Sequence, residues 1–167
     1  MGSFYVGKRF KGIQPGISLS FSNLAPDQQI QVEASLLYYP FKNNHFYGMT
    51  TGAFLKNGTQ QQYVVSQKIG GKLLKKVWYQ AEFMYGNLSN YQQSNTFLTY
   101  NTFDPILLLA GINFDIHAGK HFVFNPGYNF RQKESSSLQY SLEAPSGIIQ
   151  TQTYFDHLIK MSLQWNF

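Results

Sequence analysis

Apolar residues occupy every second position over most of this chain, and this period limits what it can fold into. In residues 17–22 the odd positions hold isoleucine, leucine and phenylalanine, and every even position holds serine. Side chains with this spacing would scatter around a helix but form one face of a strand. The same alternation continues at 30–38, 77–85, 108–117, 121–131 and 159–167. We therefore expect an all-β protein without helices.

Short and long connections alternate between these segments. Weaker strands are expected at 3–10, 45–55 and 61–71. This leaves short links at 11–15, 41–44, 71–76 and 118–120, and longer ones at 23–29, 56–60, 87–103 and 134–150. Transmembrane β-barrels combine short periplasmic turns with longer external loops, so the order favours such a barrel. The short links carry lysines and no acidic residue, whereas the long links carry both charges.

The composition helps to decide which face of the strands contacts water. Charged residues make up 13% of the chain, about half of the share in soluble globular proteins, while aromatic residues make up 17%. A soluble domain with so few charges would have difficulty covering its surface. The chain has no cysteine, which excludes disulfides, thiolate nucleophiles and cysteine-bound metals. No run reaches the roughly 18 consecutive apolar residues of a transmembrane helix.

The last segment ends on an aromatic residue of its apolar row, which is Ile159, Met161, Leu163, Trp165 and Phe167. In this row it resembles the C-terminal signature of bacterial outer-membrane β-barrel proteins. The resemblance implies a closed antiparallel up-and-down transmembrane β-barrel of 8–10 strands, surrounded by outer-membrane lipid and lipopolysaccharide. It also implies that the barrel-assembly machinery reads this row. The abundance of tyrosine, asparagine and glutamine is similar to that of barrels from Bacteroidota.

A sheet that spans lipid must close, because lipid cannot satisfy backbone N–H and C=O groups. We expect residues 1–167 to form one such domain. The alternation gives about nine strands, although single-chain bacterial barrels have even numbers. Either 1–10 is not a full strand, or an upstream strand is missing, or 96–103 pairs separately. Pro126 falls on the apolar face in mid-strand, where we expect a bulge to accommodate it.

The alternation assigns residues to an outward and an inward face. Aromatic side chains near strand ends are expected at the membrane interfaces, namely Tyr39, Tyr47, Tyr79, Tyr85, Tyr128 and Trp165. Charged residues are expected in the lumen, namely Glu33, Glu82, Asp115, Arg131, Asp156 and Lys160, together with Lys68. We interpret them as a salt-bridged network, because unpaired charges in a narrow lumen are costly. The alternative is a charged pore lining or a carboxylate pair for acid–base chemistry.

Other patterns do not define a site. His117 and His121 flank a short turn near Asp115, which fits a simple hairpin better than a metal site. Asp156 and His157 have no nucleophile motif nearby, and Ser135–Ser137 are expected in a loop. The basic run at 70–76 lacks the ending of a phosphate-binding loop, and the cations are too dispersed for nucleic acid. We predict no catalytic residue, metal or cofactor.

Four functions are compatible with this pattern. The first is a non-enzymatic barrel with a structural or interaction role, as a subunit of an envelope complex with other envelope proteins. The second is a narrow pore or transporter, although bulky residues expected to point inward favour a plugged lumen, namely Phe54, Trp78, Met84 and Leu109. The third is an outer-membrane lipid-modifying enzyme. The fourth is a soluble lipocalin-like barrel, since alternation alone does not say which face is wet.

Overall fold

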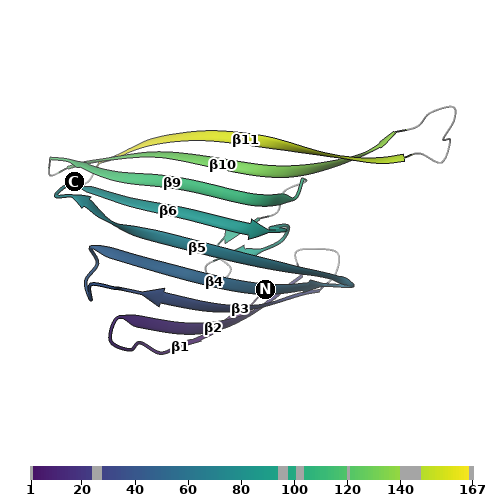
Figure 1. The fold of residues 1–167 in the computed structure, drawn as a ribbon, viewed down its shortest axis with the longest axis horizontal. Coiled ribbons are helices and arrows are strands. Elements are labelled where there is room, and N and C mark those ends of the chain that lie inside the picture. The colour runs from purple at the N-terminus through teal and green to yellow at the C-terminus, as the bar shows by residue number, and fades with distance from the viewer. Residues whose placement is uncertain are drawn as a thin grey trace.

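The computed structural model describes residues 2–23, 28–93, 98–100, 104–119, 121–139 and 148–165. They form a nine-stranded antiparallel sheet in which the strands lie side by side in chain order (Figure 1). Its strands are β1 (Gly2–Gly7), β2 (Ile13–Ser22), β3 (Gln29–Tyr38), β4 (Phe46–Asn57), β5 (Gln60–Leu74), β6 (Val77–Gly86), β9 (Ile106–Ala118), β10 (Phe122–Gln139) and β11 (Ile148–Trp165). The predicted all-β, up-and-down architecture is confirmed. Within these ranges no helix is long and apolar enough to cross a membrane.

Two short strands lie outside this sheet. They are β7 (Gln92–Gln93) and β8 (Leu98–Thr99), and they pair with each other in a separate two-stranded sheet. One of the three explanations for the odd strand number was a separate pairing within 96–103, and β8 pairs in this way. The large sheet nevertheless contains nine strands without it.

The nine-stranded sheet is open. Among the described strands, β1 pairs with β2 alone and β11 pairs with β10 alone, so the predicted closed barrel is not present in the structure. The odd number determines what closure would require. In an antiparallel meander of nine strands, the first and the last run in the same direction. These two edges could join each other only as a parallel pair, whereas every pair in the sheet is antiparallel.

The two faces of the sheet have opposite polarity. On β3, Gln31 is 1% exposed, while Val32 beside it is 42% exposed. On β2, Ser20 is 2% exposed and Phe21 is 48% exposed. We call the face that carries Gln31 the inner face and the face that carries Val32 the outer face. Soluble proteins bury apolar side chains and expose polar ones, so this arrangement is inverted.

The strand register keeps the outer apolar residues together across the sheet. Val32 lies opposite Leu19 of β2 and Phe54 of β4. Further along the sheet, Ile112 of β9 lies opposite Tyr128 of β10. Because side chains alternate with a period of two, a slip by one residue would turn a whole strand over. The alternating sets predicted from the sequence therefore share one face, as expected.

Some individual side chains differ from the prediction. Phe54 was expected to point inward, but its register places it on the outer face. Tyr47 was expected at an outer interface, but it lies on the inner face and its hydroxyl donates to Gln80 Oε1 at 3.2 Å. The outer face also carries a polar pair, in which Thr50 Oγ1 donates to Gln67 Oε1 at 2.6 Å. Each of these side chains makes a local hydrogen bond or ring contact. The alternation of apolar residues in the sequence does not show such contacts.

The connections alternate between the two ends of the sheet, as predicted, but their lengths do not all follow the prediction. β4 and β5 are joined by 58–59 alone, where a longer link was expected at 56–60, while β3 and β4 are joined by 39–45, where a short link was expected. In Figure 1 the β1–β2, β3–β4 and β5–β6 turns are at the left, and the β4–β5 turn is at the right. β10 and β11 have 18 residues each and extend well into the segment expected as a loop at 134–150. Ser135–Ser137 are therefore strand residues, and the prediction that they lie in a loop was wrong.

No bulge forms at Pro126. The β9–β10 ladder stops at the pair of Phe124 and Ile116 and resumes at Gly127 and Asn113 in an unchanged register. The irregularity of this strand pair lies between Gln132 and Lys133 instead. Proline has no N–H for the ladder, and the neighbouring Asn125 side chain donates across the gap to Asp115 Oδ1 at 2.6 Å. A side-chain hydrogen bond thus bridges the gap that we expected a bulge to absorb.

Candidate functional site

Between β6 and β9, the described residues fold back against the inner face of the sheet, and we call 87–93, 98–100 and 104–105 the insert. Leu88 N–H donates to the Ile106 carbonyl at 2.9 Å, which closes the base of the insert. Asn90 N–H donates to the Tyr100 carbonyl at 2.8 Å, and Tyr100 N–H donates to the Tyr91 carbonyl at 3.0 Å. Asn90 has a φ of 61°, in the left-handed region that asparagine tolerates better than most residues. The described part of the insert is thus folded.

Two glutamines of β3 hold the insert by its backbone. Gln31 Nε2 donates to the Gln92 carbonyl at 2.6 Å, and Gln31 Oε1 accepts from Gln92 N–H at 2.9 Å. Gln29 Nε2 donates to the Asn90 carbonyl at 2.8 Å. A buried backbone group without a hydrogen-bond partner costs about 1–3 kcal/mol. These side-chain amides supply the hydrogen bonds that a neighbouring strand would otherwise make. β3 therefore sets the position of the insert on the inner face.

Tyr91 connects the insert to the carboxylate of Glu33. Its hydroxyl donates to Glu33 Oε2 at 3.0 Å, and its ring stacks on Tyr100 with centroids 6.2 Å apart. Burial raises the pKa of the Tyr91 hydroxyl, and the nearby Glu33 raises it further. Burial, followed by the charge of Glu82, raises the pKa of Tyr100 to about 12. Both phenols are therefore protonated at neutral pH and act as hydrogen-bond donors.

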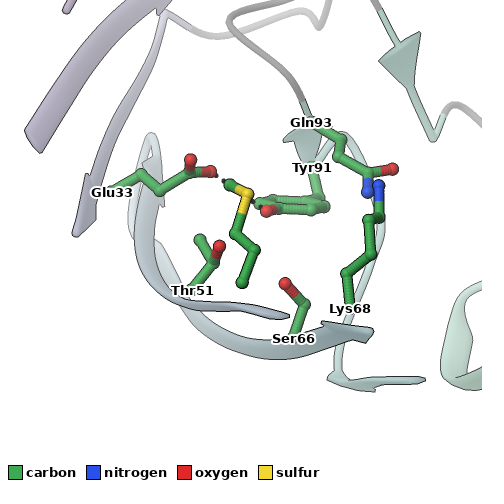
Figure 2. A pocket seen from close by; sticks show the side chains of 7 residues that line it. Glu33, Thr51, Ser66, Lys68, Tyr91 and Gln93 are labelled. Atoms are coloured by element: carbon green, nitrogen blue, oxygen red, sulfur yellow. Dashed lines mark hydrogen bonds between the residues drawn. The ribbon is translucent and has the colours of Figure 1, made fainter. Parts of the chain in front are cut away.

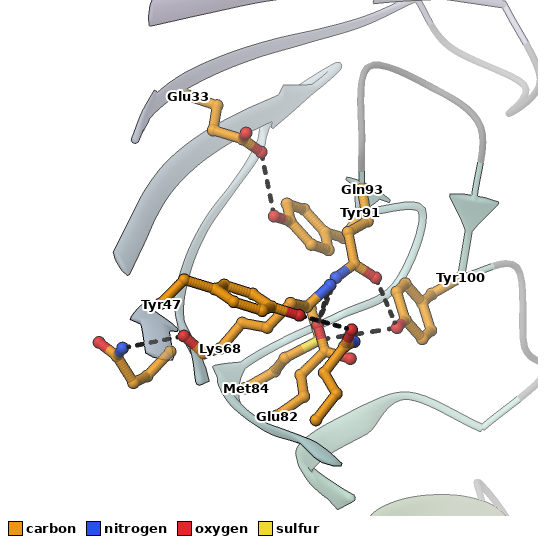
Figure 3. A network of polar contacts seen from close by, with 10 residues as sticks. Glu33, Tyr47, Lys68, Glu82, Met84, Tyr91, Gln93 and Tyr100 are labelled. Atoms are coloured by element: carbon orange, nitrogen blue, oxygen red, sulfur yellow. Dashed lines mark hydrogen bonds and ion pairs between the residues drawn. The ribbon is translucent and has the colours of Figure 1, made fainter. Parts of the chain in front are cut away.

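A second carboxylate, Glu82 of β6, is held by an ion pair and an amide. Lys68 Nζ of β5 lies 3.3 Å from Glu82 Oε1, and Gln93 Nε2 of the insert donates to the same oxygen. Tyr100 donates from its hydroxyl to Gln93 Oε1 at 3.0 Å. Figure 3 shows these contacts running from the sheet into the insert and back. A partly buried ion pair is better tolerated when further hydrogen bonds reach it, and Gln93 supplies one here.

Apolar packing fixes the other side of the insert. Leu88 and Tyr91 are fully buried, and Ile106 lies beside them at the start of β9. They pack in one cluster with inner-face side chains of β4, β5, β6 and β9, namely Ala53, Leu55, Val64, Met84 and Leu109. Burying a large apolar side chain contributes about 1.5–3 kcal/mol, so this small core holds the insert in place. Met84 and Leu109 point inward, as the sequence predicted.

A small polar cavity remains between the insert and the sheet. Its volume is about 40 Å³. Figure 2 shows Glu33, Thr51, Ser66, Lys68 and Tyr91 around this space. A polar cavity of that size has room for a water molecule or two, whereas pockets for organic ligands measure about 300–1,000 Å³. The cavity can hydrate the network, but it cannot hold a substrate.

The charged residues predicted for the lumen do not form one network. Glu33 and Glu82 both bind the insert, whereas Asp115 accepts from Asn125 on the β9–β10 pair of the same face. Asp156 Oδ2 pairs with Lys133 Nζ at 2.7 Å, a partner that the sequence reasoning did not include.

Two further residues predicted for the lumen, Lys160 and Arg131, differ in their hydrogen bonds. With the Asn129 amide turned so that its nitrogen donates to the Tyr128 carbonyl, its oxygen accepts from Lys160 Nζ at 3.0 Å. Arg131 Nε is buried and has no hydrogen-bond partner among the described residues. The inner face thus carries separate polar clusters, one at the insert and others between the neighbouring strands β9, β10 and β11.

The strands separate the residues of the lipid-enzyme hypothesis. Asp156 belongs to the inner face, but His157 belongs to the outer face, where its Nδ1 lies 2.7 Å from the Tyr128 hydroxyl. Neighbouring residues on a strand point to opposite faces, so this pair cannot share a substrate. The described ranges also hold no group of three or more histidine, aspartate or glutamate residues placed to bind a metal ion.

The C-terminal row lies on the outer face of β11. Ile159, Met161, Leu163 and Trp165 are 60–73% exposed. Phe167, the last member of the predicted signal, lies outside the described residues. Trp165 contacts Phe122 of β10, with ring centroids 5.0 Å apart. The alternation that defined the row is thus present in the structure, while its reading by an assembly machinery stays a prediction.

No protein-family model, curated protein or solved structure matches this chain. The function is therefore inferred from the residues and their geometry. The sequence reasoning missed the residues that matter most for the insert, namely Tyr91, Gln92, Gln93 and Tyr100 on one side and Gln29 and Gln31 on the other. A signal was present, because Gln29, Gln31 and Glu33 alternate on the inner face and each needs a hydrogen-bond partner when buried.

Proposed function

We propose that the chain is a membrane-spanning β-barrel protein of the bacterial outer membrane, with a structural or interaction role. In this proposal lipid and lipopolysaccharide contact the outer face, and the insert fills the lumen. The chain is inserted by the barrel-assembly machinery and serves as a subunit of an envelope complex. Among the residues that the structure describes, no catalytic constellation supports an enzyme and no basic stripe supports binding to nucleic acid.

The observation that carries the proposal is the inverted burial of the sheet. Its outer face presents Val32, Phe21 and Ile17, with exposed fractions of 42%, 48% and 61%, while glutamine and serine are buried on the other side. Each apolar side chain left in water forgoes about 1.5–3 kcal/mol of burial free energy. Large exposed apolar patches are typical of membrane or protein contacts, and a lipid environment would solvate this one along every strand.

The proposal includes closure of the sheet in the membrane. An open edge exposes backbone N–H and C=O groups, each of which costs several kcal/mol in lipid. β1 and β11 run in the same direction, so one further strand between them would make ten and keep every pair antiparallel. A parallel β1–β11 pair would close nine strands directly. Both routes give a ring with the insert inside.

The insert favours a plugged barrel over a pore. Its backbone is bound to β3 through Gln31 and Gln29, and its side chains are bound to β6. The polar cavity between the described part of the insert and the sheet has a volume of about 40 Å³. Conduction requires a continuous water-filled path, and open porin lumens belong to barrels with more strands. We therefore expect the intact protein to be silent in a planar-bilayer conductance measurement.

Fractionation and gel migration test this proposal. The protein should sediment with outer membranes, and its gel migration should change after heating, because a closed barrel unfolds slowly in detergent. The control is the same protein after boiling, compared with an unheated sample. A variant without the apolar outer face is not a suitable control, because the proposal requires that face for insertion. Recovery as a soluble monomer without detergent would refute the proposal.

A further inference from the structure

The β1–β2 and β3–β4 turns enclose a hollow at the short-turn end of the sheet. Its volume is about 450 Å³, within the range of pockets that bind small organic ligands. Tyr39 N–H donates to the Gly12 carbonyl at 2.6 Å, which ties one turn to the other. Gly12 and Lys42 both have a positive φ, 87° and 55°, so each turn bends sharply at the rim. We call this space the basic hollow.

Three cations line the basic hollow, and no carboxylate does. They are Arg9, Lys11 and Lys42. The ion pairs found in the described part of the chain involve Lys68 and Lys133, so these three cations have no acidic partner there. Like charges around one space repel each other, and a bound anion would relieve that repulsion.

One carboxylate, Asp115, also lies at this end of the sheet. Asp115 lies opposite Trp78 across the β6–β9 pair and accepts from Asn125 at 2.6 Å. The other turn cations, Lys72, Lys75 and Lys76, add to the positive field, and Lys72 Nζ lies 5.6 Å from the Trp78 ring centroid. The field at the short-turn end is therefore positive.

An aromatic wall continues from the cations into a second hollow of about 330 Å³. The two hollows share Tyr39 and Asn44, and the second one adds Leu37, Tyr47 and Trp78. The guanidinium carbon of Arg9 lies 5.6 Å from the Tyr39 ring centroid. The N–H donors of a guanidinium lie in its own plane, where they can bind an oxyanion in a bidentate manner.

We propose that this hollow binds a phosphate group carried on an aromatic or acyl moiety. Arg9 would grip the phosphate with paired N–H donors, while Lys11 and Lys42 complete the charge balance. Tyr39, Trp78 and Leu37 would receive the apolar part. A phosphomonoester carries nearly two charges and three acceptor oxygens, which suits three cations better than a carboxylate does. The two turns supply the cations, and the ends of β3, β4 and β6 supply Leu37, Tyr47 and Trp78 of the wall.

Ligand titrations of the full chain in a non-ionic detergent test this proposal. A Trp165→Phe background leaves Trp78 as the one tryptophan, and its fluorescence reports on the aromatic wall. The probes are inorganic phosphate, phenyl phosphate and a short-chain phosphatidic acid below its micellar concentration. We expect phenyl phosphate to saturate the signal and bind about tenfold or more tightly than inorganic phosphate, because its ring buries apolar area. If the phosphatidic acid binds most tightly, the natural ligand is a lipid headgroup. If phenyl phosphate binds as tightly as the phosphatidic acid, the natural ligand is a soluble phosphate ester.

A matched pair of double variants separates a built site from general charge. Arg9→Gln with Lys42→Gln should weaken phenyl phosphate binding about tenfold or more, because both direct contacts are lost. Lys75→Gln with Lys76→Gln removes the same charge from the neighbouring turn and should weaken it by less than about threefold, since salt screens distant charges. If the first pair does not fold, as judged by its gel migration, Lys11→Gln takes its place. No saturable binding of any probe, or equal losses in both pairs, would overturn the proposal.

Discussion

Replacing Val32 by arginine should destabilise the protein in lipid by about 2–4 kcal/mol, the cost of an arginine at the bilayer midplane on the lipid face of a barrel. Val32 is 42% exposed and sits in the middle of β3 on the outer face. In water such a residue would tolerate arginine with little change, because surface substitutions usually stay within about 0.5 kcal/mol. The sign and size of the effect therefore report on the solvent of the outer face. Denaturant unfolding from lipid vesicles measures it.

Ile13 provides the matched control for this substitution. It is also an exposed apolar residue of the outer face, but it lies at the short-turn end of β2. Near the interface the same arginine should cost only about 0–1 kcal/mol, because its side chain can reach water. A depth-dependent difference between Val32→Arg and Ile13→Arg is the expected result. Equal and small effects at both positions would contradict a lipid-facing outer surface.

Replacing Tyr91 by alanine should release the insert from the inner face. The change removes a fully buried ring, its stacking on Tyr100 and its hydrogen bond to Glu33. Large-to-small replacements of aromatic core residues cost about 3–5 kcal/mol. The free energy of unfolding should fall by that amount, and limited proteolysis should cut the insert much faster. Since the insert occupies the inner face, we also expect ion conductance to appear in planar bilayers.

Tyr91→Phe separates the hydrogen bond from the packing. It keeps the ring but leaves the buried carboxylate of Glu33 without this donor, at a cost of about 1–3 kcal/mol. The insert should remain seated, so conductance should stay silent while stability falls by the smaller amount. If the alanine variant is as stable, as protease-resistant and as silent as the unmodified protein, the insert does not plug the sheet. That outcome would remove the structural basis for choosing a plugged barrel over a pore.

The strands and the polarity of their faces followed from local sequence. Ser18 and Ile17 alternate within a strand, and their spacing already places them on opposite faces whatever the rest of the chain does. The order of the strands followed as well, because short links join neighbours in a meander. The edges could not be predicted in this way, since closure depends on partners for β1 and β11 that no local pattern specifies.

The contacts of the insert were outside the reach of periodicity. Tyr91 meets Glu33 across 58 positions of the chain, and Gln92 meets Gln31 across 61. Such pairings depend on how the insert folds back onto the sheet, which no single segment determines. The inner-face glutamines indicated that hydrogen-bond partners were needed, but not which residues would provide them. In the same way, Asp156 was predicted to join a lumen network, but its partner is Lys133, only one strand away.

Spin-label accessibility along β3 tests most directly whether the outer face is in contact with lipid. The chain has no cysteine, so single-cysteine variants at residues 29–34 each carry one label. In membranes, labels at Ile30, Val32 and Ala34 should collide mainly with oxygen, which concentrates in lipid. Labels at Gln29, Gln31 and Glu33 should be shielded from oxygen. A water-soluble nickel complex that reaches Ile30, Val32 and Ala34 more readily than oxygen does would contradict the proposal.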